Sequence, residues 1–141
     1  MSTGLHQVLV DAVLSERACR THEAVRFELM GALLRADRQP EPGSPIVDVA
    51  CGTEDGRVLY EVLGAGLAAY ADLRAGAVRL MEINYTLPEP VGALCLVLAC
   101  PPVEDWSAAA VRDVFGVHVL WRTRDGWEGE GVEVALGRVR G

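Results

Sequence analysis

The sequence contains no lysine: its 13 basic residues are all arginines, and they face 20 aspartates and glutamates. A composition rich in Arg, Ala, Gly and Val is typical of a high-GC coding bias, which by itself favours arginine over lysine. The formal net charge of −7 disfavours binding to a phosphate backbone, because such binding needs a surface of the opposite sign. Nucleic acid is therefore a disfavoured partner unless a local arginine patch overrides the net charge.

Long apolar runs and paired cysteines are missing as well. No apolar run reaches the roughly 18 residues that span a bilayer, and no basic segment precedes an apolar stretch at the N-terminus. The four cysteines are scattered, without the C-x-x-C pairs or histidine spacing typical of zinc sites. We therefore expect a cytoplasmic protein with reduced cysteines and without a membrane segment.

What the chain does contain is a large share of core-forming residues. Half of its 141 residues are hydrophobic, and a chain of this length can bury a core without disulfides or a structural metal. No internal repeat or low-complexity segment divides the sequence. It predicts one α/β domain over residues 1–141, with a tail that frays from about residue 137.

Apolar periodicity and turn residues outline the secondary structure. Helical spacing predicts helices over residues 5–14, 21–36 and 67–85, and a brief helix that ends near residue 114. β-rich runs predict strands over residues 45–51, 57–63, 93–100 and 117–121. The Asp55-Gly56 pair between the first two runs is a strong hairpin signal. A second turn at Arg124-Asp125-Gly126 predicts a C-terminal hairpin, in which residues 132–136 return as an antiparallel edge strand.

Two carboxylates stand out in the first hairpin. Its strands are apolar on both faces except for Asp48 and Glu61, which predicts central strands covered by helices. A buried charge without a partner is costly, so each carboxylate needs a partner or a place at a strand end. Arg26 and Arg74 lie at or within the apolar arcs of their helices and are the expected partners. The simplest interpretation is a structural ion pair that holds helices on the sheet.

The order of elements is helix, hairpin carrying Asp then Glu, helix, apolar strand, helix, strand. From Thr21 to Trp121 this order resembles the core of the restriction-endonuclease-like (PD-(D/E)xK) superfamily. The resemblance implies a three-layer α/β/α domain in which an aspartate and a Glu-x-Lys motif hold Mg²⁺, which generates the attacking hydroxide. By position the metal ligands are Asp48 and Glu61. The helical glutamate of the family falls on Glu23 or Glu28, and the helical wheel favours Glu23.

The sequence departs from this family at the motif lysine. Leu63 occupies that position, and no other lysine can take its place. Arg74 or Arg26 could supply the cation, although arginine stays charged and is a poor proton acceptor. The candidate catalytic residues are therefore Asp48, Glu61, Arg74 and Glu23, with Mg²⁺ as the cofactor if the protein is active.

Three functions remain open at this stage. The first is a catalytically impaired nuclease-fold domain that binds a protein partner or itself. Trp121 and Trp127 most simply cover the edges of the core, and the alternative is that they form an exposed contact patch on the C-terminal hairpin. The second is a Mg²⁺-dependent nuclease in which an arginine replaces the lysine. The third is a small-molecule or nucleotide-binding domain with its pocket near residues 64–70, where Gly64-Ala65-Gly66 precedes a helix. His22 is interpreted as a satisfied, semi-buried histidine.

Overall fold

The computed structural model describes residues 3–42, 46–89 and 91–137, and these residues form a five-stranded mixed sheet and five helices. The last residues of the predicted fraying tail, 138–141, lie outside the described part. Along the chain the elements are α1 (Thr3–Arg17), α2 (Arg20–Arg35), β1 (Val49–Thr53), β2 (Gly56–Leu63), α3 (Tyr70–Thr86), β3 (Ala93–Leu98), α4 (Ser107–Phe115), β4 (Val117–Thr123), β5 (Gly126–Glu128) and α5 (Val132–Leu136).

The strands lie side by side in sequence order, and only the two outer pairs are antiparallel. β2 runs parallel to β3, and β3 runs parallel to β4, so α3 and α4 serve as crossover connections. The predicted alternation of helices and strands is thus confirmed, and so is the hairpin turn between β1 and β2. The near-continuous apolar sequences of β2 and β3 follow from this arrangement, because both faces of these strands are covered.

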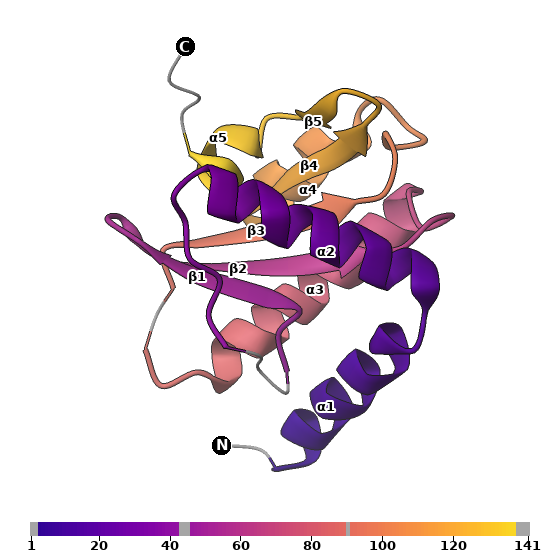
Figure 1. The fold of residues 1–141 in the computed structure, drawn as a ribbon. Helices are drawn as coiled ribbons and strands as arrows, with labels where there is room; N and C mark the ends of the chain where they lie inside the picture. The colour runs from indigo at the N-terminus through magenta and orange to yellow at the C-terminus, as the bar shows by residue number, and fades with distance from the viewer. Residues whose placement is uncertain (1–2, 43–45, 90, 138–141) are drawn as a thin grey trace.

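Helices cover both faces of the sheet and produce two separate hydrophobic cores (Figure 1). One core lies between the sheet and α1, α3 and α4, and includes Leu59 and Leu63 of β2. The other lies between the sheet and α2 and α5, and includes Val58, Tyr60 and Val62 of β2. This division follows from the period-two alternation of side chains along a strand. No helix in the described ranges is long and apolar enough to cross a membrane.

The prediction for residues 132–136 is wrong, because they form the helix α5 instead of a strand. β5 ends after three residues, and the chain then turns back over β4 at Gly129 and Gly131. Gly129 has a φ of 112°, and a Cβ atom there would lie 2.7 Å from the ring of Trp121, so the turn requires glycine. The expected C-terminal hairpin exists, but its return strand is β5.

Trp121 and Trp127 cover the edges of the core, as the simpler interpretation of the sequence expects, and they do not form the alternative contact patch. The β4–β5 register pairs Trp121 with Glu128 and Arg122 with Trp127, so the two indole rings lie on opposite faces of the hairpin. Trp121 packs against the core on the α3 side, whereas Trp127 packs against the core on the α2 side. Both side chains are half-buried and do not form a common surface.

Candidate functional site

Asp48 and Glu61 come together across the first hairpin. Asp48 directly precedes β1, which begins at Val49 and not at residue 45 as predicted. Because the register pairs Val49 with Tyr60, its continuation places Asp48 opposite Glu61. Asp48 is 2% exposed and Glu61 is fully buried. The antiparallel hairpin therefore places two carboxyl groups next to each other inside the protein.

The start of α2 holds Asp48 in place. Asp48 Oδ2 accepts a hydrogen bond from the Val62 amide at 2.8 Å and lies 3.2 Å from Nε2 of the buried His22. The Nε of Arg26, one turn further along α2, donates to the main-chain carbonyl of Asp48 at 2.9 Å. The predicted contact of Arg26 with this region is present, but it is made to the backbone of Asp48 and not to its carboxylate.

The cation at Glu61 is Arg79. Its Nη1 lies 2.6 Å from Glu61 Oε2, and the same nitrogen also contacts Oε1 of Glu16 at the end of α1. Arg74, which the sequence favoured for this role, has an exposed side chain and makes no ion pair within the described residues. Arg74 and Arg79 flank the buried stripe of α3 on opposite sides, and only the Arg79 side faces α1 and the carboxylates.

The electrostatics of the carboxyl pair favour one shared proton. Burial raises the pKa of Glu61 well above its usual value, and the charge of Asp48 and a hydrogen bond between the two carboxyl groups raise it further. Arg79 acts against this shift because it stabilises the ionised form of Glu61. Burial also lowers the pKa of Arg79, although the nearby Glu82 partly opposes that change.

Of the two candidate helical glutamates, only Glu23 lies next to the cluster. Glu23 accepts a hydrogen bond from Arg26 at 3.1 Å, and its Oε1 lies 3.8 Å from His22 Nδ1. Glu23 therefore does not contact Asp48 directly; His22 and Arg26, which both contact Glu23, link it to Asp48. Glu28 lies on the outer side of α2, where it pairs with Arg122 at 2.9 Å. The helical wheel was therefore a sound guide in favouring Glu23 over Glu28.

Sequence reasoning missed Glu16. Its Oε2 lies 3.2 Å from His22 Nε2, so Glu16 joins His22 and Asp48 in a group whose ligand atoms all lie within 4.8 Å of one another. Such a mixture of imidazole and carboxylate donors can hold a divalent cation. Glu16 lies just beyond the predicted end of the first helix, and no local signal marked it. His22 did carry a signal, because it lies on the apolar side of its helix.

Four buried oxygen atoms in the cluster lack a hydrogen-bond donor within the described part of the chain, and two of them belong to the central carboxyl pair. Asp48 Oδ1 and Glu61 Oε1 are both inaccessible, and no N–H or O–H group of the described residues donates to them. A proton shared between the two carboxyl groups would satisfy these atoms, and so would a bound cation. The donor set that fits a divalent cation is Glu16, His22 and Asp48, whereas Glu61 lies outside this group and is paired with Arg79.

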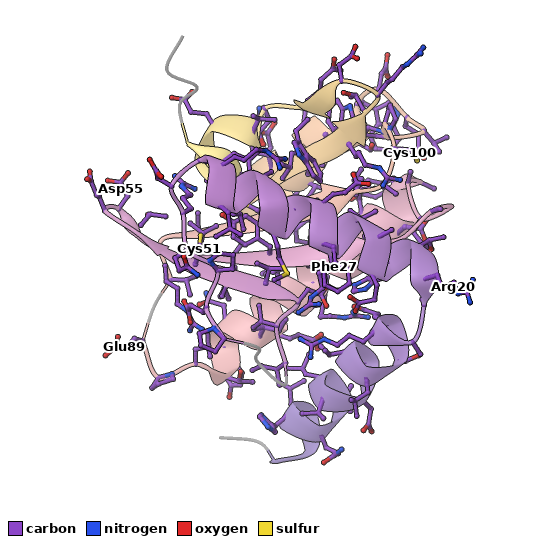
Figure 2. The ribbon with its side chains drawn as sticks, in the orientation of Figure 1. Arg20, Phe27, Cys51, Asp55, Glu89 and Cys100 are labelled. Carbon is purple, nitrogen blue, oxygen red and sulfur yellow. The ribbon has the colours of Figure 1, made fainter. Side chains whose placement is uncertain are left out.

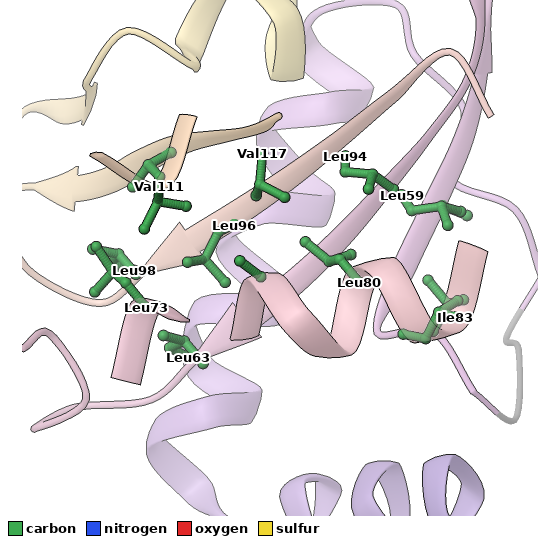
Figure 3. Packing of buried hydrophobic residues seen from close by; sticks show 14 of the residues in the cluster. Leu59, Leu63, Leu73, Leu80, Ile83, Leu94, Leu96, Leu98, Val111 and Val117 are labelled. Atoms are coloured by element: carbon green, nitrogen blue, oxygen red, sulfur yellow. The ribbon is translucent and has the colours of Figure 1, made fainter. Parts of the chain in front are cut away.

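Leu63, at the position of the family lysine, belongs to the hydrophobic core. Its side chain is 8% exposed and packs with the leucines on the α3 side of the sheet (Figure 3). It lies against Gly76 of α3, where a Cβ atom would be 3.5 Å from Leu63 Cδ2 and 2.6 Å from Leu96 Cδ1. Leu63 thus contributes apolar surface to the core at the position where the resemblance expects a lysine.

The Gly64-Ala65-Gly66 segment does not form a phosphate loop. Gly64 packs against the start of α2, where a Cβ atom would lie 2.8 Å from Thr21 Oγ1. α3 begins only at Tyr70, whose amide donates to Glu104 Oε1 at 2.9 Å, and the Ala69 amide donates to Asp72 Oδ2 at 3.3 Å. Carboxylates of the chain therefore occupy the helix N-terminus that an anionic ligand would need.

Comparison with known proteins gives no match: no protein-family model, curated protein or solved structure is similar to this chain. The interpretation of the site therefore depends on its own geometry.

Proposed function

We propose that the protein is a catalytically impaired nuclease-fold domain that acts as a binding or regulatory protein. Its element order and its Asp48–Glu61 pair resemble the restriction-endonuclease-like core. The observation that carries the proposal is the state of this pair: both carboxyl groups are buried, and Arg79 and His22 already contact them. A nuclease needs these groups open to a metal and a phosphodiester.

The chemistry of the nearby side chains supports the same conclusion. Leu63 can neither position a water molecule nor balance charge in a transition state. Arg79 is the cation closest to the pair, and a guanidinium stays protonated and therefore cannot serve as a general base. The described residues around Asp48 and Glu61 therefore lack the lysine that would position and activate a water molecule.

A nuclease assay tests the proposal. Purified protein is incubated with single- and double-stranded DNA and with RNA, in the presence of Mg²⁺ or Mn²⁺, and the products are resolved on a gel. The matched control is Asp48→Asn, which keeps the shape of the side chain but removes its charge. We expect no cleavage above the level of this control. Metal-dependent cleavage by the wild type that Asp48→Asn abolishes would overturn the proposal.

A second candidate function is a divalent-metal-dependent nuclease in which Arg79 takes the place of the motif lysine. Buried oxygens without donors, among them Asp48 Oδ1 and Glu61 Oε1, favour it, and so does the neighbouring group of Glu16, His22 and Asp48. A bound cation would supply Lewis acidity and a metal-activated water. Isothermal titration with Mg²⁺ and Mn²⁺, repeated on Asp48→Ala/Glu61→Ala, separates the two candidates when it is combined with the cleavage assay. Binding without cleavage agrees with an impaired enzyme, and binding with cleavage identifies an active one.

A further inference from the structure

A groove of about 480 Å³ lies on the opposite flank of α2 from the carboxylate cluster. Its walls are the outer side of α2 and the β4–β5 hairpin, which lie next to each other in Figure 1. A hollow of this size is within the range of small-ligand and peptide-anchor sites. The side chains that decide its chemistry are Phe27, Glu28, Arg35, Arg122, Arg124 and Trp127.

Local sequence explains why the groove is open. Gly31 has no side chain, and a Cβ atom there would lie 3.3 Å from Nη1 of Arg35, which belongs to the next turn of α2. On the other wall Arg122 and Trp127 form a cross-strand pair that faces α2. The absence of a side chain at Gly31 thus leaves space between α2, which contributes Phe27 and Arg35, and the hairpin, which contributes Arg122, Arg124 and Trp127.

The groove has a charge opposite to that of the whole protein. Three arginines line it, against the single carboxylate of Glu28, which is already paired with Arg122 at 2.9 Å. Arg35 and Arg124 are exposed, and neither has a carboxylate partner within the described ranges. In a chain with a net charge of −7, two uncompensated arginines at one hollow form a local site of positive potential.

Two aromatic side chains, Phe27 and Trp127, lie in the same groove as the arginines. Phe27 is 61% exposed on the outer surface of α2, where Figure 2 labels it, and the ring of Trp127 is half-buried in the opposite wall. Aromatic and arginine side chains are the residues that most often dominate the binding energy of protein interfaces. The Arg26 guanidinium lies 5.7 Å from the Phe27 ring centroid, so the same helix links this groove to the Asp48 region.

We infer that this groove binds an acidic segment of a protein partner. An apolar side chain of the segment lies between Phe27 and Trp127, and its carboxylates contact Arg35 and Arg124. This inference rests on the proposed function as a binding protein and names the partner's chemistry. A polypeptide fits better than a nucleic acid, because an extended phosphate backbone needs many cationic contacts and is repelled by the net negative charge of the chain.

Selection from a phage-displayed library of random peptides on the immobilised protein tests the inference, with EDTA present to exclude metal effects. We expect the enriched peptides to share Asp or Glu residues next to Trp, Phe or Leu. The best peptide is then synthesised and titrated by two-dimensional NMR. Its chemical-shift changes should centre on residues 27–35 and 122–127. No enrichment, enrichment of peptides without acidic residues, or shifts centred elsewhere would overturn the inference.

Charge-reversal variants make the test specific to the groove. Arg35→Glu/Arg124→Glu changes two exposed side chains and is expected to weaken binding of the synthetic peptide by about tenfold or more. The matched control is Arg74→Glu, an exposed arginine on α3 across the sheet, which should leave the affinity unchanged. NMR spectra of the free variants verify their folding. Equal weakening by both variants would overturn the inference, and so would tighter binding of an oligothymidine strand than of the peptide.

Failure of the proposed function and failure of the peptide-binding inference can be distinguished. Nuclease activity of the wild type would contradict the proposed function without affecting peptide binding measured in EDTA. Absence of a groove-directed peptide would contradict only the inference, provided that the wild type also fails to cleave nucleic acid.

Discussion

Arg79 of α3 lies against Glu61 of β2, with 2.6 Å between Nη1 and Oε2, and this pair joins the helix layer to the centre of the sheet. Glu61 is fully buried, whereas Arg79 is 28% exposed and also contacts Glu16 of α1. One guanidinium therefore connects three elements. The carboxylate depends on this cation more than the cation depends on the carboxylate, since Arg79 keeps access to water.

Replacement of Arg79 by methionine should therefore destabilise the fold. Glu61 would keep its buried position without a cation, and we expect the free energy of unfolding to fall by about 1–3 kcal/mol. The cost stays below that of a fully buried pair because Glu61 can bind a proton. Urea denaturation followed by tryptophan fluorescence measures the change. Arg74→Met is the control and should stay within about 0.5 kcal/mol of the wild type; a larger effect at Arg74 than at Arg79 would contradict the assignment.

The pKa of Glu61 predicts how stability depends on pH. Because this pKa is raised above the usual 4.5, the folded chain holds the proton more tightly than the unfolded chain. Glu61 therefore contributes stability that is fully present below pH 4.5 and is lost as the pH rises through the higher folded pKa. Glu61→Gln cannot ionise and should remove this part of the decline.

Urea denaturation at a series of pH values, from acidic to mildly alkaline, provides the measurement. The free energy of unfolding of the wild type should fall relative to that of Glu61→Gln as the pH increases. Glu54→Gln, in the exposed turn of the first hairpin, is the matched control and should follow the wild-type curve. Parallel curves for wild type and Glu61→Gln would show that Glu61 has the same pKa in both states.

The sequence predicted the elements that depend on local signals. Asp-Gly placed the first hairpin with Asp48 before the turn and Glu61 after it, and the β1–β2 register then brings the two carboxylates together. The choice between Glu23 and Glu28 followed from helical periodicity in the same way. These relations need only the geometry of one helix or one hairpin.

The partners of the carboxylates could not be predicted in this way. Arg74 and Arg79 both flank the buried stripe of α3, and only the packing of α3 beside α1 decides which one reaches Glu61. The contact between Glu16 and His22 depends on the angle between α1 and α2, and no short sequence motif encodes that angle. Residues 132–136 carry a pattern that suits a strand, yet the glycine turn after β5 and the contacts to Arg38 and Tyr60 make them helical.

Tyr60 should be important for the position of α5. Its hydroxyl donates to the Ala135 carbonyl at 2.5 Å, beside Arg38 Nη1, which donates to the same oxygen at 2.7 Å. Tyr60→Phe removes one of the two donors, and we expect a loss of about 1 kcal/mol and faster amide exchange in α5. Hydrogen exchange measured by mass spectrometry tests this. The exposed Tyr85→Phe is the control, and equal exchange in α5 for both variants would contradict the role of Tyr60.

Leu63→Lys restores the residue type of the resembled motif, and it tests whether Leu63 alone prevents catalysis. Leu63 is packed against Gly76 and Leu96, so an ammonium group there would be buried without a partner. We expect a loss of about 2–4 kcal/mol in stability. Leu63→Met, which keeps the apolar volume, should cost less than about 1.5 kcal/mol.

We also expect no cleavage of DNA or RNA by Leu63→Lys in Mg²⁺ or Mn²⁺, because Arg79 and His22 would still occupy the carboxylates. The assay is made at a temperature at which circular dichroism shows the variant to be folded. Metal-dependent cleavage by the folded variant would mean that the metal centre is intact and that one substitution separates this protein from an active nuclease. Absence of cleavage, together with the loss of stability, would mean that residue 63 serves the hydrophobic core and that a lysine there is not sufficient for catalysis.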